Sequence, residues 1–146
     1  MNKSRLKLKI VGLIAVLMLL MAFGPISIGE ETAETELEIH GVKGKTGELV
    51  VAVLNVGDTI AENIIITISV EGGILGKIDI NHECVGCSQC GTTLEPGSMK
   101  IESTQEEGLI VGFGQVEIIV TASASNANEV TRTLNGLVIG PFIIIT

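Results

Sequence analysis

The chain has 146 residues, of which 46% are apolar, and this is enough for one domain with its own core. It contains no Trp or Tyr and only three Phe residues, which argues against single-stranded nucleic-acid surfaces built on aromatic platforms. From residue 30 onward, five basic residues stand against all 17 acidic residues, a net charge of −12. A segment this acidic repels phosphate backbones, so we expect no nucleic-acid partner.

An uncharged apolar segment covers residues 10–28, directly after four basic residues. As a helix it would be roughly 28 Å long at about 1.5 Å per residue, near the thickness of a bilayer core. The basic residues before it predict a cytoplasmic N-terminus and an exported remainder. Residues 1–29 are therefore interpreted either as a signal peptide, cleaved after Gly29, or as an uncleaved membrane anchor. Both alternatives place the remainder outside the cytoplasmic membrane, anchored or secreted.

The acidic residues 30–36 have no periodic apolar positions and predict an extended spacer. Beyond them, short stretches alternate between apolar and polar residues, as half-buried strands do. Two such strands are clearest, one burying Ile64, Ile66, Ile68 and Val70, the other burying Val116, Ile118, Val120 and Ala122. Other inward-facing residues are expected at Leu37, Ile39, Ile74, Ile78, Ile80, Met99 and Ile101, with His40 on a solvated face.

Three further stretches give more specific expectations. Residues 49–54 are apolar on both faces, which predicts a strand covered on both sides. A bulge is predicted at Asn135-Gly136. The apolar run 137–145 is interpreted as a buried final strand, or as an edge that adds to the sheet of a neighbouring molecule.

These stretches amount to seven or eight short strands separated by turn residues, with no amphipathic helix among them. They predict an all-β antiparallel sandwich over residues 37–146, preceded by one N-terminal hydrophobic helix. Residues 81–93 interrupt the pattern and are expected to form an irregular insertion.

Four stretches of this pattern together resemble a known family. They are Asn55-Val56-Gly57, Ala61-Glu62-Asn63 before an Ile-rich strand, Leu94-Glu95-Pro96-Gly97, and Gly114 before an alternating strand. The combination resembles the cell-adhesion-related immunoglobulin-like domain called CARDB, found in archaeal and bacterial surface proteins. The resemblance implies an immunoglobulin-like sandwich that serves as a spacer or adhesive module and not as an enzyme. The final strand lacks the paired asparagines that often end such domains, and the insertion 81–93 is foreign to the family pattern.

All three cysteines of the chain lie in that insertion, within His82-Glu83-Cys84-Val85-Gly86-Cys87-Ser88-Gln89-Cys90. The preferred interpretation is a disulfide among Cys84, Cys87 and Cys90, since disulfides form outside the cytoplasm, with no cofactor. The alternatives are reduced thiols, or a zinc or iron site with the three cysteines and His82 as ligands. A ferredoxin-type cluster lacks its fourth cysteine, because Leu94 occupies that position. Haem attachment fails because Ser88 replaces the required histidine.

No Ser/His/Asp set is present, since neither histidine lies in a recognisable nucleophile context. The adjacent Glu106 and Glu107 are expected to be solvated in a turn. We therefore expect a non-enzymatic envelope module with a structural, adhesive or assembly role. Its expected partners are the membrane, if the N-terminal segment stays uncleaved, and proteins or further copies joined through edge strands. The alternative is a metal-binding or redox-responsive surface protein that uses the loop from Cys84 to Cys90.

Overall fold

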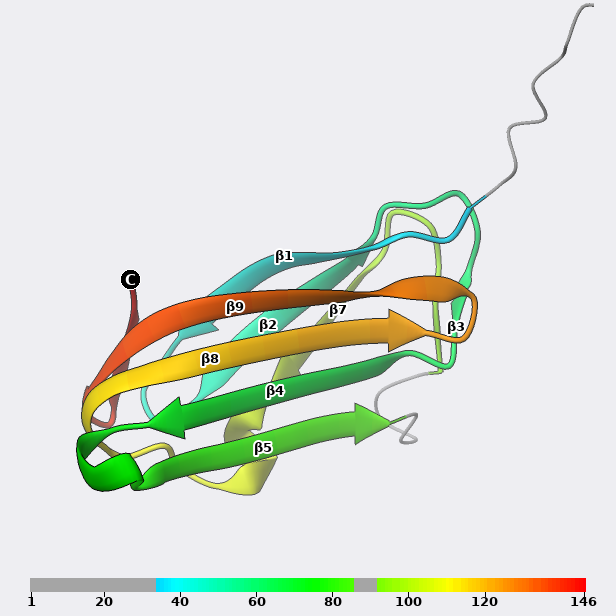
Figure 1. Cartoon of the computed structure of the whole chain (residues 1–146). Coiled ribbons are helices and arrows are strands. Elements are labelled where there is room, and N and C mark those ends of the chain that lie inside the picture. Colours follow the sequence, from blue (N-terminus) through cyan, green and yellow to red (C-terminus); the bar gives the residue numbers. More distant parts are fainter. Residues whose placement is uncertain (1–33, 86–91) are drawn as a thin grey trace, which may run out of the picture. The chain divides into compact units, whose positions relative to one another are not determined.

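The computed structural model describes residues 34–85 and 92–146, and strands dominate this part of the chain (Figure 1). They are β1 (Leu37–Gly44), β2 (Leu49–Asn55), β3 (Ala61–Glu62), β4 (Ile65–Gly72), β5 (Ile78–Val85), β6 (Thr93–Leu94), β7 (Met99–Ser103), β8 (Gly112–Ala124), β9 (Ala127–Gly140) and β10 (Phe142–Ile145). Two 3₁₀-helices, η1 (Ile74–Gly76) and η2 (Thr104–Glu107), interrupt them. The predicted all-β class is confirmed, whereas the predicted helix at 10–28 lies outside the described residues.

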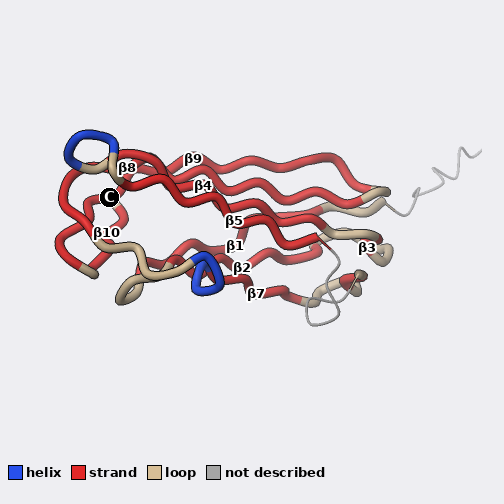
Figure 2. Tube along the Cα trace, turned by 90° about the horizontal axis from the view of Figure 1, so that it is seen from below, coloured by secondary structure: helices blue, strands red, loops and turns tan. Residues whose placement is uncertain are grey.

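The strands form two larger antiparallel sheets and one small pair. One sheet has the order β10-β9-β8-β4-β5, the other has the order β1-β2-β7, and β3 pairs with β6. Figure 2 shows the two larger sheets edge on, one layer above the other. Their facing sides share one core, to which both sheets contribute aliphatic side chains. Burial of each such side chain stabilises the fold by about 1.5–3 kcal/mol.

The two most regular strands, β4 and β8, lie side by side at the centre of the five-stranded sheet. The residues predicted to face inward are buried on both strands, so these predictions are confirmed. The pairs match across the sheet: Ile68 lies opposite Val120, and Val70 lies opposite Ile118. No aromatic side chain belongs to the core of the described residues.

The prediction for β7 was wrong, because its faces are reversed. Met99 and Ile101 are 45% and 64% exposed, whereas Lys100 is only 8% exposed. The register sets this orientation: Lys100 lies opposite Val53, whose side chain points into the core. The Lys100 ammonium lies 3.7 Å from a carboxylate oxygen of Glu102, the next inward residue, so each charge is offset by the other.

Four smaller predictions were also wrong. The predicted insertion 81–93 is regular at both ends, since β5 continues to Val85 and β6 begins at Thr93. Ile74 is exposed, because η1 folds back on itself after Gly73 and carries this side chain outward. The run 137–145 is a hairpin of β9 and β10 that turns at Gly140-Pro141. The register passes through Asn135-Gly136 without a bulge.

Asn55 joins two loops at one end of the sheets. Its side chain is fully buried, and its amide donates to the carbonyl oxygens of Thr59, at 2.8 Å, and Leu94, at 2.9 Å. Its carbonyl oxygen accepts a 3.0 Å hydrogen bond from the Gly57 N–H. The strand β2 thus ends at a side chain that bonds the backbone of the loop that follows it.

Three carboxylates form a cross-strand row on the outer face of the five-stranded sheet. Glu71 lies directly opposite both Asp79 and Glu117. Like charges in such pairs are destabilising. We call Asp79, Glu71 and Glu117 the acidic row.

Replacing the central member of the acidic row, Glu71→Gln, is expected to raise the free energy of unfolding by about 0.5–1 kcal/mol. Urea unfolding measures this, and the gain should shrink in 1 M NaCl because salt screens exposed charges. Glu95→Gln is the control, an exposed glutamate in a loop. Equal effects of the two substitutions at low salt would contradict repulsion within the row.

Candidate functional site

The structure describes two of the four predicted metal ligands, His82 and Cys84. Both lie on β5, at the edge of the five-stranded sheet. Their side chains are two positions apart on one strand, so they point to the same face, and both are buried. The other two, Cys87 and Cys90, lie outside the described residues, so neither the predicted disulfide nor the predicted metal set is tested.

The two ring nitrogens of His82 have different surroundings. Nδ1 lies 3.4 Å from a carboxylate oxygen of Glu107. Nε2 is buried and has no hydrogen-bond partner among the described residues. A histidine whose Nδ1–H is held by a carboxylate presents its Nε2 lone pair, which is the arrangement of many metal-ligating histidines. With Nδ1 against Glu107, Nε2 is the ring nitrogen of His82 that is left for a metal ion.

A crevice of about 240 Å³ opens beside these residues, between the edge strands β5 and β7 and next to η2. Its lining residues are His82, Glu83, Cys84, Ile101, Glu102, Ser103, Gln105 and Glu106. The helix η2 is held in place because the buried Thr104 hydroxyl accepts a 3.0 Å hydrogen bond from the Leu49 N–H. Its last residue, Glu107, was predicted to be only a solvated turn residue, and sequence reasoning missed its contact with His82.

The described residues do not complete a metal site by themselves. No three His, Cys, Asp or Glu side chains converge there as a metal ion requires. Residues 34–85 and 92–146 also include no helix long and apolar enough to cross a bilayer.

A second surface feature is formed by apolar side chains on the outer face of the five-stranded sheet. Phe113 lies opposite Ile139, which in turn lies opposite Phe142. These three side chains are 59%, 46% and 58% exposed. We call Phe113, Ile139 and Phe142 the aromatic row. Both described Phe side chains thus lie on the surface, where sequence reasoning did not look for a site.

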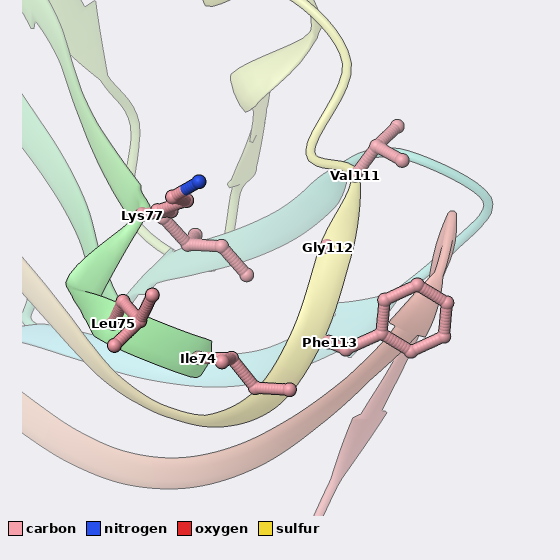
Figure 3. A pocket seen from close by; sticks show the side chains of 7 residues that line it. Ile74, Leu75, Lys77, Val111, Gly112 and Phe113 are labelled. Carbon is pink, nitrogen blue, oxygen red and sulfur yellow. The ribbon is translucent and has the colours of Figure 1, made fainter.

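A groove of about 310 Å³ adjoins the aromatic row. Figure 3 shows Ile74 and Leu75 of η1 on one side of it and Val111 and Phe113 on the other. Leu75 has a positive φ of 64° and is largely exposed. Both features are unfavourable: the left-handed backbone conformation is strained for leucine, and the apolar side chain is exposed to solvent. The apolar surface therefore continues from the aromatic row to η1.

A third feature lies on the outer face of the three-stranded sheet. A depression of about 360 Å³ is lined by His40, Gly41, Lys43, Val50, Ala52, Met99 and Ile101. We call it the apolar hollow. The strand β2 beneath it was predicted to be covered on both sides, yet only its inner residues Leu49, Val51, Val53 and Asn55 are fully buried. Among the described residues nothing covers its outer face, so this prediction was wrong for the single chain.

The predicted association through edge strands stays a prediction. The apolar terminal strand β10 is partly covered along its outer edge, because Thr46 pairs with Phe142. The backbone of Ile143 packs so closely against Gly44 that a side chain at that position would collide with it. These contacts leave β10 less open to strand addition than its sequence predicts.

Comparisons with known proteins assign no family to the chain. No protein-family model matches it, and no curated protein matches it. Among solved structures, a β-glucosidase from Kluyveromyces marxianus is similar over 74% of this chain, with 18% sequence identity and a TM-score of 0.32. The chain spans 16% of the length of that enzyme, and a likeness this weak carries no argument. The resemblance to CARDB domains stays a prediction.

Proposed function

We propose that the chain is a non-enzymatic, immunoglobulin-like module of the cell envelope, exported across the cytoplasmic membrane, with a structural, adhesive or assembly role. The observation that carries the proposal is the position of the aromatic row. Soluble domains usually bury aromatic side chains, and a contiguous exposed apolar patch marks an interaction surface. Here the core is aliphatic, and both described Phe residues are exposed. Such a surface is expected in a protein whose role is to bind other molecules and not to catalyse a reaction.

The immunoglobulin-like form of the proposal is supported by two layered antiparallel sheets around one core. It is also supported by the turn residues that resemble CARDB domains. Export is supported by the basic residues and the apolar segment that precede the acidic part of the chain.

Protease digestion of intact bacterial cells that express the full chain with a C-terminal epitope tag tests this proposal. Added protease should remove the tag without cell lysis, because the acidic part lies outside. A variant without residues 10–28 is the control, and its tag should stay protected. Protection of the tag on the unaltered chain would overturn the envelope function. Carbonate extraction then separates an anchored chain from a cleaved one.

The Nε2 of His82, which has no hydrogen-bond partner among the described residues, favours a second candidate function, metal binding or redox response at the cysteine loop. His82 and Cys84 share one face of β5, and Glu107 holds the opposite ring nitrogen of His82. We infer that these residues, with the predicted ligands Cys87 and Cys90, would hold zinc or iron.

Metal analysis of the full chain, purified without chelator, tests this second function. About one zinc or iron per chain is expected, with thiols that react only after the metal is removed. Glu107→Gln should weaken the metal affinity about 10- to 100-fold, because it removes the carboxylate that orients His82. Glu129→Gln, at an exposed position of β9, which β8 and β4 separate from β5 in the sheet, should leave the affinity unchanged. A metal-free chain with one reactive thiol, or with a thiol-linked dimer, would contradict metal binding and favour the disulfide.

A further inference from the structure

We propose that copies of this chain associate head to tail, with the aromatic row of one copy seated in the apolar hollow of the next. The inference rests on the proposed envelope function and names the partner of its exposed surface. That partner is a second copy of the same chain.

The two surfaces lie on opposite sides of the described sheets. The aromatic row is on the outer face of the strands β8, β9 and β10, and the apolar hollow is on the outer face of β1, β2 and β7. The inner faces of the two sheets share the core, so their outer faces point in opposite directions (Figure 2). Contact between two different surfaces does not close in pairs but continues from copy to copy, into a ring or an open filament. Because the two surfaces here point in opposite directions, we expect an open-ended assembly.

The apolar hollow is large enough to take aromatic side chains. Its floor is formed by two of the smallest residues, Gly41 and Ala52, which lie directly opposite each other. Met99 and Ile101 add apolar side chains from β7. A cavity of about 150 Å³ holds one benzene ring. A hollow of about 360 Å³ therefore has the volume of about two such rings, enough for side chains of the aromatic row to enter it.

The charges around the two surfaces are also complementary. The hollow is bordered by Lys43, one of only five basic residues in a described chain that has 15 acidic ones. The other titratable lining residue, His40, lies 3.7 Å from a carboxylate oxygen of Glu38. On the other side of the molecule, the acidic row lies on the same outer face as the aromatic row. Glu117 follows Phe113 by four residues, roughly 13 Å at about 3.3 Å per residue. Head-to-tail docking brings these opposite charges together, whereas pairing two identical surfaces would bring like charges together.

The exposed apolar area is large enough for a stable contact. Seven side chains contribute to it, and each is about half exposed or more: Ile74, Leu75, Val111, Phe113, Ile139, Phe142 and Ile144. At about 100 Å² each they expose roughly 700 Å², close to the ~800 Å² per partner of a standard protein interface.

Two variants of the full chain, each lacking one surface, provide the test. The row variant is Phe113→Ser with Phe142→Ser, and the hollow variant is Ala52→Arg. All three positions are at least partly exposed, and circular dichroism checks that both variants fold. If purification shows that the N-terminal segment is retained, each protein is incorporated at one copy per lipid nanodisc. Association can then not be caused by this apolar segment. Sedimentation velocity then measures the size of the particles.

The unaltered chain should form particles that grow with concentration, whereas each variant alone should stay monomeric. An equimolar mixture of the two should form one-to-one dimers, because one intact row then meets one intact hollow. Three results would overturn the inference: a monomeric unaltered chain, variants that still associate alone, or a mixture that stays monomeric. Binding of a monomeric unaltered chain to phosphatidylcholine vesicles, abolished in the row variant, would instead make the row a lipid contact.

A charge reversal gives an independent readout of the same contact. Lys43→Glu, at the border of the hollow, should weaken association about tenfold or more. The control is Lys77→Glu, which lies beside the aromatic row, adds to the acidic side of the contact and should not weaken it. Equal effects of the two would overturn the proposed orientation. A chain that is exported yet monomeric overturns only this inference, whereas a chain that assembles but stays inside the cell overturns the envelope function.

Discussion

Replacing Asn55 by leucine is expected to lower the free energy of unfolding by about 3–5 kcal/mol. Leucine has nearly the same shape but cannot bond the carbonyl oxygens of Thr59 and Leu94 or the N–H of Gly57. Each buried polar group left without a partner costs about 1–3 kcal/mol. Urea unfolding followed by far-ultraviolet circular dichroism measures the loss.

The control for this substitution is Asn81→Leu, which adds the same side chain at an exposed position of β5. It should change the stability by no more than about 0.5 kcal/mol. Similar losses at both positions would mean that the Asn55 hydrogen bonds contribute little. Two of the stretches that resemble CARDB domains, at residues 55–57 and 94–97, are joined by the side chain of Asn55. Their joint occurrence in the sequence thus has a physical reason.

Gly72→Ala is expected to cost about 3 kcal/mol or more, for two reasons that act together. Gly72 has a φ of 133°, which residues with a side chain rarely adopt. A methyl group there would also collide with the carbonyl oxygen of Gln115 and lie 3.0 Å from the Cα of Val116. Both are backbone atoms of β8 that cannot move aside, and the Gly73 N–H bonds the same carbonyl oxygen at 2.7 Å.

Gly76→Ala in the same turn separates the two reasons. Gly76 also has a positive φ, of 62°, but a methyl group there meets nothing within 4 Å. We expect it to cost about 1 kcal/mol, from the backbone conformation alone. If Gly72→Ala cost no more than Gly76→Ala in the same unfolding experiment, the close contact between the turn and β8 would not matter for stability.

The strands β4 and β8 could be predicted from the sequence because each buries one face. Their alternation of apolar and polar residues identifies that face. The strand β7 could not be predicted in this way. Its sequence, Met99-Lys100-Ile101-Glu102-Ser103, also alternates clearly, but the alternation assigns Met99 and Ile101 to the core, and the structure exposes them. The orientation is decided by pairing with β2 and by the Lys100–Glu102 ion pair, and a sequence pattern displays neither. The exposed Met99 and Ile101 line the apolar hollow, and the proposed contact with a second copy gives a reason for their exposure.

Part of the candidate site could be predicted too. His82 and Cys84 were identified as candidate ligands from their residue types, although they lie in a regular strand and not in a loop. Glu107 could not be foreseen, because it is 25 residues away and reaches His82 only through the position of η2. The aromatic row was equally hidden, because Phe113 and Phe142 become neighbours only through the register of three strands.

The aliphatic core has a practical consequence for spectroscopy. The chain has no Trp or Tyr, and Phe113 and Phe142 are the aromatic side chains of the described residues. Near-ultraviolet circular dichroism, which in most proteins reports the packing of the interior, would here respond to two rings on the surface. In a folded single copy, these two exposed rings should contribute almost nothing to that region of the spectrum. A signal that grows with concentration would show that association with a second copy restricts the motion of the Phe113 and Phe142 rings.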